Sequence, residues 1–98
     1  MSIEEISKQI VTLVEKKDKD YNKSFDKSMD KFGDMVYIIR LEDKVNRLEN
    51  IIMNHGYKVE VDEKLEDTVK DIIGYSLLFL RRLEKEKRKM WDEHSDQF

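Results

Sequence analysis

Proline is absent from this chain of 98 residues and glycine occurs only three times, which limits the possible folds more than any motif does. Proline interrupts a helix because it lacks the N–H group, and glycine weakens a helix through its backbone entropy. Charged residues make up 42% of the sequence, which is typical of helices that bury a narrow apolar stripe. We therefore predict an all-α fold, a small antiparallel bundle of about four helices in a single domain.

The composition also narrows the classes of function. No cysteine is present, which excludes a disulfide framework and a thiolate metal site. A net charge of −3 and a pI near 5.4 argue against a protein that binds nucleic acids in general. The apolar stretch of residues 72–80 is too short to span a bilayer, and the N-terminus carries acids where a signal peptide carries basic residues. We expect a soluble cytoplasmic protein with no membrane partner.

Apolar side chains recur at helical spacing in the first third of the chain. A first helix is predicted over residues 3–17, with Ser2 at the start of a capping box. After a polar loop, a short helix is predicted over residues 25–32. Ser24 is expected to be its N-cap and Gly33 its C-terminal stop.

Two longer helices are predicted in the rest of the chain. One runs over residues 34–54, and a short extended connector over residues 57–61 follows it. The last helix is predicted to start at Asp62 as its N-cap and to reach about residue 90. Residues 84–98 are highly charged and are expected to form a frayed tail. The core stripe of the first long helix is predicted to be Ile38, Leu41, Val45, Leu48 and Ile52.

A row of acids, Glu63, Asp67 and Asp71, follows the i, i+4, i+8 spacing that stacks side chains on one face of a helix. Like charges at this spacing repel one another. The helix dipole accounts for an acid in the first turn but not for Asp71, and the same row continues into Tyr75 and Phe79, which favour burial. A hard divalent cation explains the row, because Mg²⁺ takes oxygen ligands and often keeps phosphate as a co-ligand.

A second cluster lies on the preceding helix, where Arg40, Asp43, Lys44 and Arg47 share one face. Antiparallel packing of the two long helices brings these side chains across from the acid row. Carboxylates for Mg²⁺ beside Lys and Arg form the arrangement that a polyphosphate needs. The alternative interpretation is a solvated face with an i, i+4 pair between Asp43 and Arg47.

The loop between the first two helices contains more than a connector needs. Tyr21, Ser24 and Phe25 provide aromatic rings and a hydroxyl within five residues. These side chains are candidates for one wall of a binding site, and the alternative is that Tyr21 and Phe25 simply fill the core.

The order of the motifs DYNKSFDKSMDKFG, IRLEDKVNRLENI and VDEKLEDTVKDIIGYSLLFL resembles the nucleotide modification associated domain 1 family, a domain of unknown function also called DUF1599. The family pattern is D-Y-G-x-S-F, then R-x-x-D-K-x-x-R-L, then D-E-x-x-x-D-T-x-x-D-x-x-x-Y. The resemblance covers about residues 20–80. Asn22 stands where the pattern has glycine.

That family is similar to the MazG-like all-α nucleoside triphosphate pyrophosphohydrolases, which cleave between the α and β phosphates with Mg²⁺. The resemblance implies a MazG-like bundle, a nucleotide ligand and Mg²⁺ as the cofactor, with Glu63 helping to activate water. The implied metal ligands are Asp43, Glu63, Asp67 and Asp71; the implied phosphate contacts are Arg40, Lys44 and Arg47; the implied nucleoside contacts are Tyr21, Ser24 and Phe25.

The chain departs from the MazG-like pattern, which has an E-x-x-E pair on the first acidic helix where this chain has Asp43 with Lys44. Two alternatives to the enzyme therefore stay open: a nucleotide-binding module without turnover, and a small helical phage protein that binds a host protein through residues 81–89. A phage origin would place it in the host cytoplasm. Residues 72–80 are more apolar than a small monomer easily covers, so we also expect a homodimer.

Overall fold

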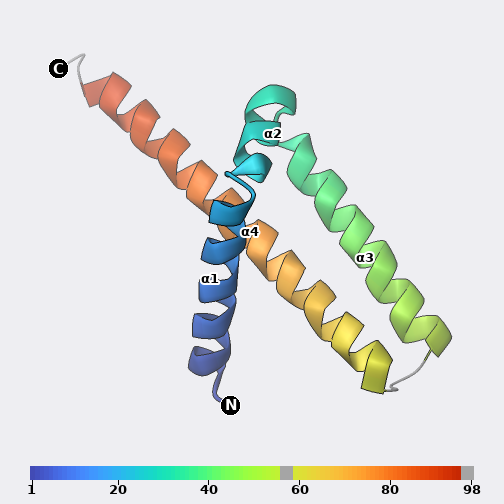
Figure 1. The fold of residues 1–98 in the computed structure, drawn as a ribbon. Helices are drawn as coiled ribbons and strands as arrows, with labels where there is room; N and C mark the ends of the chain where they lie inside the picture. The colour runs from blue at the N-terminus through green and yellow to red at the C-terminus, as the bar shows by residue number, and fades with distance from the viewer. Residues whose placement is uncertain (56–58, 96–98) are drawn as a thin grey trace.

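The computed structural model consists of helices α1 (Ile3–Asp20), α2 (Ser24–Phe32), α3 (Met35–His55) and α4 (Val59–Ser95) (Figure 1). It describes the backbone of residues 1–55 and 59–95 and the side chains of residues 1–54 and 63–92. No strand occurs in the described backbone, and the predicted all-α class is confirmed. α3 and α4 pack antiparallel, α1 crosses α4, and α2 covers the end where α3 begins.

The helix α1 starts at the predicted capping box. Ser2 is the N-cap, and its side chain accepts a hydrogen bond from the backbone N–H of Glu5 at 3.1 Å. The helix continues to Asp20, three residues past its predicted end, so Lys17 lies inside the helix. Ile10 is buried, whereas Ile3 at the start of the apolar stripe is exposed, because α1 contacts α4 only where the two helices cross.

The short helix α2 is anchored by two buried side chains. Phe25 and Met29 point into the molecule, as their i, i+4 spacing predicts. Gly33 ends the helix with a φ of 84°, which glycine adopts without steric cost, so the predicted stop is confirmed. The predicted N-cap is wrong, because Ser24 is the first helical residue and Lys23 is the cap, without a side-chain hydrogen bond.

Two of the five residues in the predicted core stripe of α3 are partly buried. These are Leu41 and Leu48. Ile51, which is not part of the predicted stripe, is buried instead of its neighbour Ile52. The other predicted members, Ile38, Val45 and Ile52, are exposed. The sequence offers apolar residues on two sides of α3, and contact with α4 buries only one of these sides.

The helix α4 starts before its predicted first residue, Asp62, and includes Val59, so neither that N-cap nor the whole extended connector is found. Tyr57 and Lys58 of the connector lie outside the described residues. α4 also continues to Ser95, beyond its predicted end. Its last turns project away from the other helices, and their described side chains are exposed (Figure 1).

The close crossing of α1 and α4 depends on Gly74, which is buried. A Cβ atom at this position would lie 3.0 Å from Cγ2 of Val14, so a larger residue would require Val14 to shift. On the other side of α4, the hydroxyls of Tyr37 and Ser76 are hydrogen-bonded at 2.7 Å. The ring of Tyr37 stacks on Phe79 with centroids 4.3 Å apart, which fixes α3 against α4.

In the part of the chain that the structure describes, no helix is both long enough and apolar enough to cross a membrane.

Candidate functional site

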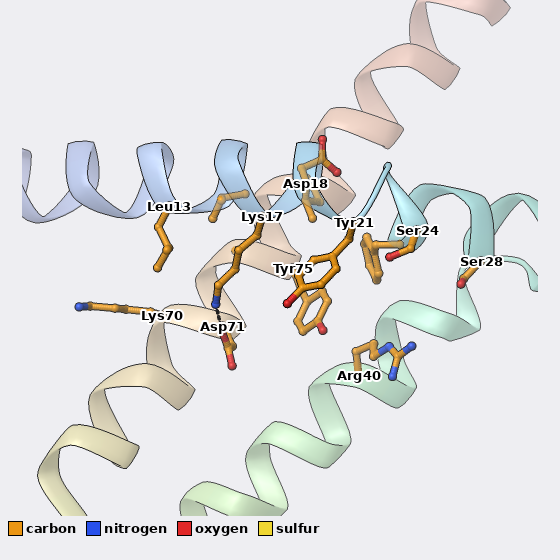
Figure 2. A pocket seen from close by; sticks show the side chains of 14 residues that line it. Leu13, Lys17, Asp18, Tyr21, Ser24, Ser28, Arg40, Lys70, Asp71 and Tyr75 are labelled. Atoms are coloured by element: carbon orange, nitrogen blue, oxygen red, sulfur yellow. Dashed lines mark hydrogen bonds and ion pairs between the residues drawn. The ribbon is translucent and has the colours of Figure 1, made fainter. Parts of the chain in front are cut away.

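A cavity of about 450 Å³ lies where the four helices meet (Figure 2). α4 provides its floor through Asp71, Gly74 and Tyr75, and α1 provides one wall through Leu13 and Val14. Its volume is within the range of small-molecule sites. A second cavity of about 370 Å³ adjoins it, because Leu13, Lys17, Lys70 and Asp71 line both.

One end of the main cavity is aromatic. Tyr21, Phe25 and Tyr75 line it, and the rings of Phe25 and Tyr75 are tilted with their centroids 5.0 Å apart. Phe25 is buried, whereas Tyr21 is exposed at the rim, which leaves its ring available to a planar ligand. The hydroxyls of Ser24 and Ser28 lie at the same cavity and provide hydrogen-bonding groups.

A tight turn between α1 and α2 places Tyr21 and Ser24 at the cavity. Asn22 and Lys23 both have left-handed backbones, with φ of 52° and 56°. The N–H of Lys23 donates to the carbonyl of Asp18 at 2.8 Å, which closes the end of α1. The left-handed conformation explains why glycine suits position 22, and asparagine tolerates this conformation better than most residues.

Arg81 of α4 joins the two sides of this turn. Its Nη2 atom donates hydrogen bonds to Asp18 of α1 at 3.0 Å and to Asp26 of α2 at 2.9 Å. Burial disfavours the charge on Arg81, but hydrogen bonds and attraction from Asp18 and Asp26 outweigh it and raise the pKa of Arg81. The clamp formed by Arg81, Asp18 and Asp26 therefore holds the turn at the aromatic end of the cavity in place.

A similar contact fixes the corner between α2 and α3. Arg82 bonds to Asp30 at 2.6 Å and to Asp34 at 3.3 Å. The hydrogen bond to Asp30 is the main cause that raises the pKa of Arg82. Two adjacent arginines of α4 thus hold both connections around α2.

The other end of the main cavity is charged. Asp71 on the floor forms an ion pair with Lys17 of α1 at 3.5 Å (Figure 2). It forms a second ion pair with Lys44 of α3 at 3.0 Å, so one carboxylate is shared by two lysines. Lys70 lies at the same place and is paired with Glu66 at 3.0 Å. The adjoining cavity adds Asp67, as well as Arg47 and Thr68.

Arg40 lines the main cavity and Arg47 lines the adjoining one. Neither guanidinium forms an ion pair or a hydrogen bond with any described residue, and the pair between Asp43 and Arg47 that a solvated face would show is not formed. These two arginines thus offer free donors at the edge of a cavity that already contains a shared carboxylate, Asp71. Such an edge attracts anions, because Arg binds phosphate oxygens in a bidentate manner.

The structure brings many of the predicted site residues together. Tyr21, Ser24 and Phe25 line the main cavity with Arg40 and Asp71. Lys44 reaches the same place through its ion pair with Asp71, while Asp67 and Arg47 line the adjoining cavity.

Two of the four predicted metal ligands lie elsewhere. Asp43 on α3 and Glu63 on α4 are exposed and line neither cavity. Among the described residues, no three carboxylate or histidine side chains form a group that could hold a metal ion. Asp67 and Asp71 do line one cavity together, so a site for a cation would consist of these two carboxylates and oxygens from a ligand.

Lys17 and Lys70 were missed by the sequence analysis. Lys17 was placed at the end of a helix, yet it follows Leu13 by four residues and Val14 by three, which puts it on the face that packs against α4. This spacing was the available signal. Lys70 gave no such signal, because it lies among charged residues in sequence and only the crossing of α1 over α4 makes it part of a wall.

Comparison with known proteins gives one match. The model of the family described as nucleotide modification associated domain 1 matches residues 17–83. This range contains every residue that lines the two cavities except Leu13 and Val14. No curated protein and no solved structure matches the chain.

Proposed function

Because the chain belongs to the nucleotide modification associated domain 1 family, we propose that the two adjoining cavities bind a nucleoside triphosphate. The aromatic end formed by Tyr21, Phe25 and Tyr75 would hold the nucleoside. The charged end, with Arg40 and Arg47 at its edge, would hold the phosphates. The two ends together match the two halves of a nucleotide, one planar and one anionic.

The observation that carries this proposal is the pair formed by Arg40 and Arg47, which have no carboxylate partner among the side chains that the structure describes. The whole chain has a net charge of −3, so an excess of cations at one cavity is a local feature and not a consequence of composition. Asp18, Asp67 and Asp71 also line the two cavities, but Lys and Arg side chains outnumber them there, and a local excess of one sign of charge attracts the opposite sign. Lys17 and Lys44 add two more cations, and Asp71 neutralises only one of them.

The residues also fit Mg²⁺ when it arrives with a triphosphate. Mg²⁺ is commonly held by one or two carboxylates together with phosphate oxygens. Asp67 and Asp71 meet this requirement, because they line the same cavity. Bound there, the ion would offset the negative charge of the phosphates. Asp43 and Glu63 would not take part in this two-carboxylate site.

The reaction that the MazG-like resemblance implies is hydrolysis between the α and β phosphates, and we propose it as the activity to test. In this proposal Arg40, Lys44 and Arg47 hold the phosphates and offset their negative charge, which otherwise opposes attack by water. The side chain of Glu63 is exposed and lines neither cavity. Its predicted catalytic role therefore depends on a loss of activity in a Glu63 variant.

Binding is tested by calorimetry and thermal unfolding of the full chain with a panel of Mg²⁺-nucleoside triphosphates. A ligand at 100 times its Kd stabilises the folded state by about 2.7 kcal/mol. In Arg40→Met the guanidinium is lost, and a charged hydrogen bond contributes about 1.5–3 kcal/mol, so affinity should fall at least tenfold. The matched control is Arg88→Met, because Arg88 is exposed and pairs with Glu84 outside the cavities.

The outcome separates binding from turnover. Absence of binding to every triphosphate in the unaltered protein, or an equal loss in both arginine variants, would refute the proposal. Pyrophosphate release measured in the same samples tests the reaction, with Asp67→Ala and Glu63→Gln as variants. Release that disappears in Asp67→Ala supports the hydrolase, whereas binding without release in the unaltered protein identifies a nucleotide-binding module.

A further inference from the structure

Both oxygens of the Asp71 carboxylate are occupied by lysines. Oδ1 lies 3.5 Å from Nζ of Lys17 on α1, and Oδ2 lies 3.0 Å from Nζ of Lys44 on α3. Figure 2 shows the side chain of Lys17 reaching from α1 to Asp71 on α4. A carboxylate that holds Mg²⁺ must offer at least one oxygen to the ion. A metal-binding role of Asp71 therefore requires that one of the two lysines leaves.

The two lysines hold Asp71 with unequal strength. The contact made by Lys17 is the longer one, and the side chain of Lys17 is 49% exposed, against 23% for Lys44. An exposed ion pair contributes little to stability, because water screens the attraction and the long side chain loses conformational freedom. Lys17 is therefore the partner that Asp71 exchanges more readily, whereas Lys44 is held more firmly.

Lys17 remains at the charged end of the site after it leaves Asp71. It lines both cavities, as Asp71 does, whereas Arg40 and Arg47 line one cavity each. The flexible four-carbon stem of a lysine lets its ammonium group turn to another partner while the backbone stays in place. An ammonium group released at the wall that the two cavities share can contact phosphate oxygens that the two arginines also bind.

We propose that Lys17 changes partner when the ligand binds, from the carboxylate of Asp71 to the phosphates. This inference rests on the proposed binding of a Mg²⁺-triphosphate. Mg²⁺ alone has to compete with Lys17 for Asp71, and a triphosphate alone has to compete with Asp71 for Lys17. The complex of the two satisfies both groups at once, because Mg²⁺ takes the carboxylate and the phosphates take the ammonium group. The site therefore selects the complex over either part.

The experiment measures the two parts of the ligand separately in the full chain. Mn²⁺, which prefers the same oxygen ligands as Mg²⁺, is titrated alone, and the free ion is counted by electron paramagnetic resonance. Mg²⁺-triphosphate analogues with a methylene group between the α and β phosphorus atoms are titrated by calorimetry, so that no hydrolysis occurs there. In Lys17→Met, Mn²⁺ should bind about threefold more tightly, because Asp71 loses its exposed partner. The analogues should bind about tenfold more weakly, because one charged hydrogen bond to the phosphates is lost.

Lys70→Met is the matched control. Lys70 lines the same two cavities but pairs with Glu66 at 3.0 Å, so its loss removes the same charge and frees no oxygen of Asp71. A general effect of charge predicts equal changes in the two variants, and equal changes would overturn the proposal. An unchanged or weaker affinity of Lys17→Met for Mn²⁺ would overturn it as well. Because Lys17 is half exposed, its replacement should not unfold the protein, which circular dichroism verifies.

The unaltered protein separates this inference from the proposed function. If it binds neither the triphosphates nor their analogues, the proposed function fails and the exchange of Lys17 fails with it. If it binds them while Lys17→Met and Lys70→Met behave alike, nucleotide binding stands and only the exchange is refuted. Lys16→Met is a second control, because Lys16 is exposed and lines neither cavity, so this variant should bind Mn²⁺ and the analogues as the unaltered protein does.

Discussion

Replacement of Arg81 by methionine tests whether the clamp holds α1, α2 and α4 together. Methionine keeps most of the aliphatic stem but removes the charge, which leaves Asp18 and Asp26 facing each other. Removing one partner of a buried ion pair costs about 3–5 kcal/mol, whereas an exposed pair contributes about 0–1 kcal/mol. The side chain of Arg81 is 37% exposed and that of Asp18 is 8% exposed, so solvent screens part of the effect. We expect a loss of about 2 kcal/mol.

The measurements are urea unfolding, which gives the free energy of unfolding, and thermal unfolding, which gives the Tm, both followed by circular dichroism. In a domain of this size a loss of about 2 kcal/mol lowers the Tm by roughly 10 °C. Arg88→Met is the control, because Arg88 is 77% exposed and its pair with Glu84 should change stability by no more than about 0.5 kcal/mol. Adding Asp26→Asn to Arg81→Met should restore about 1 kcal/mol by removing the repulsion. Equal effects of the two methionine variants, or no recovery in the double variant, would refute the reasoning.

Three further predictions concern the connections between helices. Lys23→Gly should stabilise the protein by about 0.5 kcal/mol in urea unfolding, because φ is 56° there and glycine avoids the left-handed cost; a loss would contradict this. Gly74→Leu should destabilise by about 2 kcal/mol in thermal unfolding, because the side chain would displace Val14 and α1; an unchanged Tm would show that α1 is not held at this crossing. Tyr37→Phe should cost about 1 kcal/mol through the lost bond to Ser76, and an unchanged stability in Tyr37→Phe beside a large loss in Tyr37→Ala would assign the effect to the ring instead.

Local signals in the sequence predicted most helix boundaries well. The predicted range 34–54 agrees with α3 within one residue, and the capping box of Ser2 and the stop at Gly33 are both present. These features depend on residues close together in the chain. The caps at Ser24 and Asp62 failed because Ser24 is itself the first residue of α2 and α4 starts at Val59, before Asp62, and good capping residues occur by chance in a sequence this polar.

Only part of the site could be predicted, because its residues come from separate segments of the chain. Tyr21 and Arg40 belong to separate motifs, yet both line the main cavity. The spacing of an acid row shows which face of α4 it occupies, but it cannot show how far along the helix the neighbouring helices extend. Asp67 and Asp71 lie where α1 and α3 converge, whereas Glu63 lies earlier on α4 and stays exposed.

The sequence by itself determined that the chain is helical and which residues recur on each helix face, because backbone propensity and the 3.6-residue period act within a single helix. Only the tertiary structure decided which of the two apolar sides of α3 is buried. Helix packing chose Leu48 and left Val45 exposed, and the crossing at Gly74 brought Lys17 of α1 to Asp71. Such choices depend on contacts between residues far apart in the chain, and no local pattern records them.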